Sequence, residues 1–199
     1  MVTIGVLALQ GGVREHINHL DNLADVKAVT IKKKEEFAKI DGLILPGGES
    51  TTIGRLLNIF DLKDIIIESA KNGLPIWGTC AGMILLAKEI ANTEEKHLEL
   101  MDITVKRNAY GNQLDSFTTR AKIPQIAKKE IPLTFIRAPY IINVGPEVEV
   151  LLQLKGEIVA AKENNLLVTS FHPELDQDLS FHRYFAKLAI ENKSLQIAQ

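Results

Sequence analysis

The first half of the chain alternates between short apolar segments and segments with helical spacing, and this alternation constrains the fold more than any other feature. We expect strands at residues 2–9, 26–31, 42–46 and 74–78. We expect helices at residues 13–24, 51–60, 63–72 and 83–90. Short, almost wholly apolar strands separated by helices indicate a parallel sheet that is covered on both faces.

The second half changes character, because extended segments replace most of the helices. We expect strands at 103–108, 116–121, 133–141, 148–154, 157–163 and 166–171, and a last helix at 179–191. The charged run at 32–37 is expected to begin a solvated helix. The chain is most economically one domain, residues 1–199. The predicted fold class is α/β, an open and mostly parallel sheet with an added antiparallel portion in the second half.

Composition narrows the classes of partner. The formal net charge of −2 comes from 23 basic and 25 acidic residues, which gives no reason to expect nucleic acid or a membrane as a partner. The apolar run at 2–9 is too short for a membrane span, so it is interpreted as the first strand. A single cysteine cannot form an internal disulfide, and an active thiol persists best in a reducing compartment, so we expect a cytoplasmic protein.

The only cysteine, Cys80, lies in the turn between a predicted strand and a predicted helix. With Gly78 and Gly82 it forms a Gly-x-Cys-x-Gly turn, which matches a nucleophile elbow, because small neighbours let the backbone bend sharply. The N-terminus of the following helix would favour the thiolate. Free cysteines are also among the most buried residues, so the turn alone leaves both a reactive and an inert cysteine open.

The segment LPGGEST, residues 45–51, follows another predicted strand. Its two glycines can present backbone N–H groups to a ligand, and Ser50 or Thr51 can cap a helix that begins there. Phosphate binding is a weak alternative, because the Walker spacing and a G-x-G-x-x-G turn are both absent. A tight turn with a helix cap explains the same residues without any ligand.

The segment SFHPEL, residues 170–175, follows a third predicted strand. The proline between His172 and Glu174 fixes the backbone, so the carboxylate can be held against the imidazole. A carboxylate in this position selects the catalytic tautomer of a histidine base and stabilises its imidazolium. A structural, hydrogen-bonded histidine remains the alternative for this loop taken alone.

Together the three loops supply a nucleophile, oxyanion donors and a base with its orienting carboxylate. Each loop follows its own strand, and in open α/β sheets the chemistry gathers at the carboxyl ends of the strands. The set fits acyl transfer from an amide or ester through a thioester. The other histidines carry less information: His16 and His19 are expected on a solvated helix face without a metal, and His97 and His182 have no recognisable setting.

The segments 78–82 and 172–174 resemble the triad, or class I, glutamine amidotransferases, whose glutaminase domains are flavodoxin-like, three-layer α/β sheets. Four further segments resemble one narrower family within this class, the glutaminase subunits of pyridoxal 5'-phosphate synthase. These segments are residues 5–16, 43–52, 107–117 and 135–141. The resemblance extends from about Ile4 to Phe185.

The resemblance implies an enzyme that hydrolyses L-glutamine to L-glutamate and ammonia, with no cofactor and no metal. It implies Cys80 as the nucleophile, His172 as the base and Glu174 as its orienting carboxylate. The backbone N–H groups of Gly48 and Ala81 would form the oxyanion hole. The residues that it implies to contact glutamine are Gly48, Glu49, Ser50, Arg107, Ile136 and Arg137.

The resemblance also implies a partner, the pyridoxal 5'-phosphate synthase subunit, which receives the ammonia for vitamin B6 biosynthesis. Gln10 would lie beside the oxyanion hole at the docking face, and docking would complete the active geometry. The family assembly contains twelve synthase and twelve glutaminase subunits. Gly12, Tyr110 and Tyr140 depart from residues common in the family, and none is expected to touch the triad.

Three other functions stay open on the residues. An amidotransferase for another acceptor would share the triad but not the segments QGGVREH and FIRAP. A catalytically idle binding module would keep only the fold. The presence of Cys80, His172 and Glu174 argues against this alternative. A cysteine protease or chaperone-like relative with the same elbow is more distant.

Overall fold

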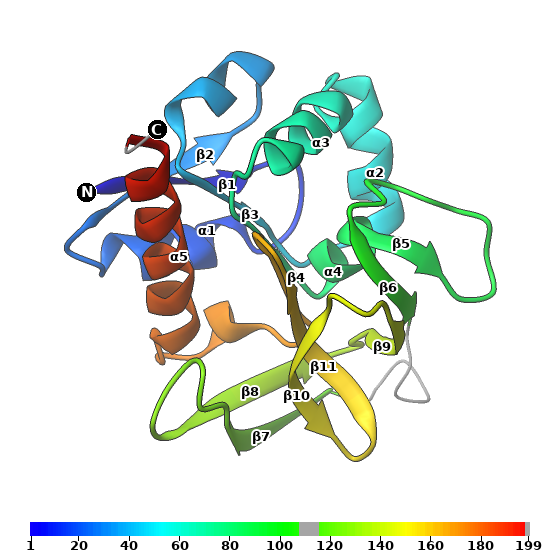
Figure 1. Cartoon of the computed structure of the whole chain (residues 1–199). Coiled ribbons are helices and arrows are strands. Elements are labelled where there is room, and N and C mark those ends of the chain that lie inside the picture. Colours follow the sequence, from blue (N-terminus) through cyan, green and yellow to red (C-terminus); the bar gives the residue numbers. More distant parts are fainter. Residues whose placement is uncertain (108–115, 198–199) are drawn as a thin grey trace.

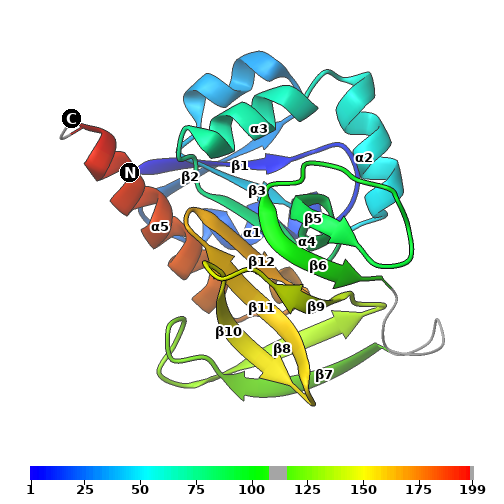
Figure 2. The same ribbon diagram turned by 45° about the vertical axis from the view of Figure 1, so that its right-hand side comes forward.

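The computed structural model describes residues 1–107 and 116–197. Within these residues, ten strands form one large sheet and two more form a small separate sheet. Helices cover both faces of the parallel part of the large sheet (Figures 1 and 2). The structure confirms the predicted fold class, a three-layer, flavodoxin-like α/β sheet that is mostly parallel in the first half and antiparallel in the second.

The parallel part of the large sheet is buried on both faces. Its strands lie in the order β2 (Val26–Ile31), β1 (Val2–Leu7), β3 (Gly42–Leu45), β4 (Ile76–Thr79) and β12 (Leu166–Thr169), and all neighbours are parallel. In β3, Leu43 and Leu45 pack into one hydrophobic cluster and Ile44 into the other. Because both faces are covered, the strand needs no polar face, which explains its continuous apolar sequence.

The helices form the two outer layers of this part. On one side lie α2 (Ser50–Ile59), α3 (Lys63–Lys71) and α4 (Ala81–Leu86), and on the other lie α1 (Val13–Asp21) and α5 (Ser180–Ile197). Two short 3-10 segments complete the set, η1 (Lys34–Lys39) and η2 (Pro173–Leu175). None of the helices in the described parts of the chain combines the length and hydropathy needed to span a membrane.

Beyond β12 the large sheet continues with mostly antiparallel strands. These are β11 (Glu157–Glu163), β9 (Tyr140–Val144), β6 (Met101–Lys106) and β5 (Ala87–Ile90), with β10 (Glu149–Leu154) beside β11. The small sheet pairs β7 (Ser116–Lys122) with β8 (Glu130–Ile136). Alternate residues Ile131, Leu133 and Phe135 of β8 join the same hydrophobic cluster as Phe181 and Phe185 of α5.

The helix predicted at 83–90 is wrong in its second half. Helix α4 ends at Leu86, and residues 87–90 form β5, which pairs with β6. Ala87 and Ile90 are buried while the two residues between them are exposed. Alanine, lysine and glutamate favour helices, so pairing with β6 outweighs the local propensity of this segment.

Two further predictions are corrected by the structure. The strand predicted at 133–141 is two strands in different sheets, separated at Arg137, whose φ of 45° breaks the extended backbone. Helix α2 begins at Ser50 with Glu49 in the cap position and without a side-chain cap, so neither Ser50 nor Thr51 is the predicted cap. The last helix also continues past residue 191 to Ile197.

Glycines allow β3, β4 and α4 to approach one another closely. A Cβ atom at Gly82 would lie 2.1 Å from the carbonyl oxygen of Leu45, and one at Gly78 would lie 2.4 Å from the carbonyl carbon of Gly82. The obstructing atoms are backbone atoms, which cannot rotate away. Glycine at these two positions is therefore required for the tight turn from β4 into α4.

We expect Gly82→Ala to lower the free energy of unfolding by about 2 to 3 kcal/mol, because the added methyl forces α4 away from β3. Denaturant unfolding followed by the fluorescence of Trp77, the only tryptophan, measures this change. Thr52→Ala on the exposed side of α2 serves as the control and should change stability by less than about 0.5 kcal/mol. Equal midpoints for the two variants would contradict the packing described here.

Candidate active site

Cys80 lies in a strained turn between β4 and α4. Its backbone has φ 47° and ψ −101°, a conformation that non-glycine residues rarely adopt. Its N–H donates a 2.8 Å hydrogen bond to the carbonyl oxygen of Thr169 on β12, which holds the turn in place. This strand-turn-helix geometry is the one predicted for a nucleophile elbow, and strain of this kind is typical of functional sites.

His172 lies between Cys80 and Glu174. Its Nδ1 donates a 2.7 Å hydrogen bond to Oε1 of Glu174, and the side chain of Cys80 lies close enough to raise the pKa of the ring. A Cβ atom at Gly47 would lie 2.4 Å from Cε1 of the His172 ring and 3.4 Å from the Cβ of Cys80. Glycine at position 47 therefore makes room for the imidazole beside the thiol. The structure brings the three predicted triad residues together.

The three side chains form a coupled electrostatic unit. Burial acts to lower the pKa of His172, but the hydrogen bonds to Cys80 and Glu174 and their charges raise it to about 10. Burial acts to raise the pKa of Glu174, yet His16 and the hydrogen bond from His172 hold it below its usual value. The site therefore favours an imidazolium beside a carboxylate.

A cavity of about 500 Å³ opens in front of the thiol. All the residues predicted to contact substrate line it, which are Gly48, Glu49, Ser50, Arg107, Ile136 and Arg137. Cys80, Ala81, His172 and Gln10 line it as well, whereas Glu174 lies behind the imidazole and does not. The cavity thus brings the predicted oxyanion-hole residues to the same place as the nucleophile.

The charged side chains of the cavity differ in how firmly they are held. Arg107 donates a 2.6 Å hydrogen bond to Glu95, and Arg107 is mostly buried. Arg137 reaches Glu49 only at 3.4 Å, and more than half of each of these two side chains is exposed. The Arg137–Glu49 pair is therefore weak and leaves a guanidinium and a carboxylate at the cavity rim.

Gln10 lies over the loop that follows β3. Its Oε1 accepts a 2.9 Å hydrogen bond from the N–H of Glu49, and a Cβ atom at Gly48 would lie 2.3 Å from the same oxygen. Glycine at position 48 thus permits this contact. The side chain of Gln10 is coupled to the loop that carries one of the predicted oxyanion donors.

Comparison with known proteins identifies the family of this chain. The model of the SNO glutamine amidotransferase family matches residues 6–191. The chain belongs to the SNO glutamine amidotransferase family. The resemblance predicted from the sequence motifs is thereby confirmed.

Curated relatives of this SNO family member match over almost their whole length. A protein of Ruminiclostridium cellulolyticum named pyridoxal 5'-phosphate synthase subunit PdxT is 55% identical over 188 residues, which is 94% of this chain and 100% of the relative. A PdxT protein of Clostridium botulinum is 55% identical over 193 residues, which is 97% of this chain and 100% of the relative.

Solved structures share the fold of this family member. A crystal structure of a glutamine amidotransferase superposes with a TM-score of 0.88 at 41% identity and covers 94% of this chain and 98% of that one. The glutaminase domain of Trypanosoma brucei CTPS superposes with a TM-score of 0.63 at 14% identity, covering 96% and 94%. The second match shows the fold alone.

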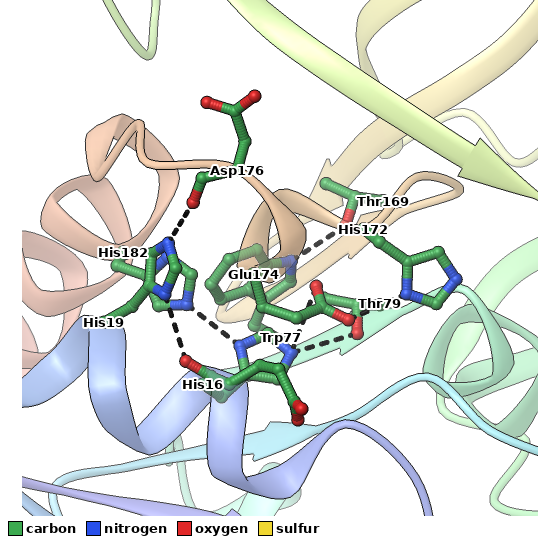
Figure 3. A network of polar contacts seen from close by, with 10 residues as sticks. His16, His19, Trp77, Thr79, Thr169, His172, Glu174, Asp176 and His182 are labelled. Carbon is green, nitrogen blue, oxygen red and sulfur yellow. Dashed lines mark hydrogen bonds and ion pairs between the residues drawn. The ribbon is translucent and has the colours of Figure 1, made fainter. Parts of the chain in front are cut away.

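The burial of two histidines behind the triad, His16 and His182, is not predicted by the sequence of this SNO family member. His16, expected on a solvated helix face, is fully buried, because its side of α1 packs toward β4 and α5 (Figure 3). His182 is also fully buried and contacts it. The available signal was Leu20, which lies one helical turn after His16 and belongs to the apolar face of α1.

Four other residues that the sequence analysis singled out are His97, Gly12, Tyr110 and Tyr140. His97 is buried, with its Nε2 3.6 Å from Glu95. Gly12, which was not expected to touch the triad, does lie against it, since a Cβ atom there would be 3.2 Å from Oε1 of Glu174. Tyr110 lies outside the described residues, and Tyr140 belongs to β9. No cluster of metal-binding side chains occurs among the residues that the structure describes.

We expect the ring of His172 to remain an imidazolium at about pH 8, because its pKa is raised to about 10. The stability that this charge contributes is fully present below the unfolded-state pKa of 6.5 and is lost as the pH rises through about 10. Nitrogen-15 shifts of the ring measure this titration, and Cys80→Ala should lower its midpoint because one partner is removed. His16 and His182 serve as internal controls and should stay neutral, since burial lowers the pKa of each. A neutral His172 at about pH 8 would contradict the expectation.

Proposed function

We propose that this chain hydrolyses L-glutamine to L-glutamate and ammonia and delivers the ammonia to a pyridoxal 5'-phosphate synthase subunit for vitamin B6 biosynthesis. The observation that carries the proposal is the contact chain from Cys80 through His172 to Glu174 at the edge of a charged cavity. The PdxT relatives, matched over their full length, support the same function.

The proposed reaction uses Cys80 as the nucleophile. Its thiolate attacks the carboxamide carbon, and the oxyanion that forms is stabilised by the N–H groups of Gly48 and Ala81, each worth about 3 kcal/mol. The imidazolium of His172 gives its proton to the departing ammonia, leaving a thioester on Cys80. His172 then takes a proton from water, whose oxygen attacks the thioester and releases glutamate. Glu174 keeps the imidazole oriented throughout.

The charges around the cavity fit a small zwitterion. The carboxylate of Glu49 suits the ammonium group of glutamine, and the guanidinium groups of Arg107 and Arg137 suit its carboxylate. Gly48, Ser50 and Ile136 complete the proposed substrate site. The weak rim pair of Glu49 and Arg137 can open toward substrate at little cost, since exposed ion pairs of this kind contribute about 0 to 1 kcal/mol.

Docking of the synthase subunit is proposed to act through Gln10. Its contact with the N–H of Glu49 couples the docking face to the loop of Gly48, so docking can adjust an oxyanion donor. We further propose an assembly of twelve synthase and twelve glutaminase subunits in the cytoplasm, with residues 1–199 acting as one glutaminase domain. The isolated chain would then hydrolyse glutamine only feebly.

The function is tested by measuring glutamate release from glutamine before and after adding the synthase subunit. We expect feeble release alone and a large increase on mixing, and we expect Cys80→Ala to lower the stimulated rate by a factor on the order of 10,000. Circular dichroism establishes that the variant folds. Retained turnover in Cys80→Ala would overturn the assignment of the nucleophile, and full activity without the synthase would overturn the coupling.

We expect Arg137→Gln to raise the KM for glutamine about 10- to 100-fold with kcat nearly unchanged, because a hydrogen bond to a charged group contributes about 1.5 to 3 kcal/mol. Steady-state kinetics with the synthase subunit present measure this change. Arg120→Gln on β7 is the matched control, because Arg120 bonds only to the backbone of Glu130 among its side-chain contacts in the described residues and does not line the cavity. An unchanged KM in Arg137→Gln would remove Arg137 from the substrate site.

A further inference from the structure

The carboxylate of Glu174 is bound on one side only. Oε1 accepts the hydrogen bond from His172, while Oε2 is buried and accepts no hydrogen bond from any residue in the described part of the chain. The polar group that faces Oε2 is Nε2 of His16, at 3.5 Å (Figure 3). Contacts between catalytic groups are often long before substrate binds and shorten in the complex.

His16 is itself held by two polar neighbours. Its Nε2 lies 3.3 Å from Oγ1 of Thr79 at the end of β4, and its Nδ1 lies 2.9 Å from Nε2 of His182 on α5. The ring of His16, which belongs to α1, thus contacts both β4 and α5. The ring is fully buried, so water does not compete for these contacts.

The positions of these atoms select one set of tautomers. A lone pair on Nε2 of His16 would face the negative carboxylate and be repelled, so Nε2 carries the proton. The Nδ1 of a neutral His16 then has the lone pair and accepts from the Nε2–H of His182. The N–H groups of His182 and His16 therefore both point toward Glu174. At the far end of this chain of contacts, Nδ1 of His182 has no hydrogen-bond partner among the described residues.

Both rings are neutral for a physical reason. Burial is the largest effect on both rings and lowers the pKa of each, and it outweighs the nearby carboxylate of Glu174, which acts to raise the pKa of His16. His16 and His19 lower the pKa of His182 further. The titratable groups around Glu174 and His16 are His172 beside the carboxylate, Glu15 and His19 on α1, and His182 on α5. A neutral N–H group can stabilise the carboxylate without adding a competing cation next to the imidazolium of His172.

We propose that His16 is a positioning residue for the triad, which directs an N–H group at Oε2 of Glu174, and that His182 fixes the tautomer that makes this possible. The carboxylate must stay ionised and oriented while His172 gains and loses its proton, and an oxygen without a donor favours protonation of the carboxyl group. The inference rests on the proposed function for its catalytic meaning, but its test does not need glutamine.

The test uses a matched pair of substitutions at position 16. In His16→Gln the side-chain amide nitrogen takes the place of Nε2, whereas in His16→Asn it takes the place of Nδ1 and leaves Oε2 without a donor. Iodoacetamide alkylates the only cysteine, Cys80, so its rate reports how reactive the thiol is beside His172. Rates are measured between about pH 4.5 and about pH 8.5, with thermal melting of each variant as the folding control.

We expect His16→Asn to lose about tenfold in alkylation rate at about pH 5 and less than about twofold at about pH 8, which corresponds to a rise of nearly two units in the pH below which the rate falls (the acid limb). The sign follows because the pKa of Glu174 rises without the donor, and a neutral Glu174 no longer stabilises the imidazolium. His16→Gln should stay within about threefold of the unmodified protein at both values. His182→Leu should shift the limb in the same direction and add nothing to His16→Asn, because it acts through the same ring.

Two results would overturn the proposal. One is an acid limb in His16→Asn that matches the unmodified protein; the other is an equal loss in the Asn and Gln variants at both pH values, which is the mark of a merely structural role. Failure of the proposed function is a separate outcome. If the unmodified protein releases no glutamate with the synthase subunit, the alkylation profiles still decide the role of His16.

Discussion

The parallel pairing of β4 between β3 and β12 is the constraint on which the site depends. In this pairing Leu45 lies opposite Gly78, and Thr169 lies opposite Thr79, so the three strands end at the same level. The segments that follow them carry Gly48, Cys80 and His172. Residues far apart in the sequence are brought to one edge because the strands that precede them are held in register.

The carboxylate of Glu174, behind the imidazole, stabilises the positive charge of His172. Glu174 is almost completely buried and would be costly to ionise alone, but it has His172 on one oxygen and His16 facing the other. The histidine in front is charged and the histidine behind is neutral, although the two side chains are of the same kind. The difference comes from their surroundings, since only His172 lies beside both the thiol and the carboxylate.

Much of this arrangement could be predicted from the sequence, because its signals are local. A glycine-flanked cysteine after an apolar strand and a His-Pro-Glu segment after another are visible without coordinates, and strand ends converge in any open α/β sheet. The burial of His16 could not be predicted in this way, since it depends on how α1 packs against α5. Residues 87–90 were mistaken for helix for a similar reason, because β6, with which they pair, is a separate segment of the chain.

The base is attached to both sheets, whereas the nucleophile is attached to the large sheet alone. Cys80 is fixed to the large sheet through Thr169, whereas the N–H of His172 donates to the carbonyl oxygen of Thr134 on β8, in the small sheet. The separation of sulfur and imidazole therefore depends on how the small sheet packs against the large one, which occurs through the rings of Phe135 on β8 and Phe171 beside His172. A partner that shifts the β7–β8 hairpin by a fraction of an ångström would change the distance between the imidazole and the sulfur without contacting either group.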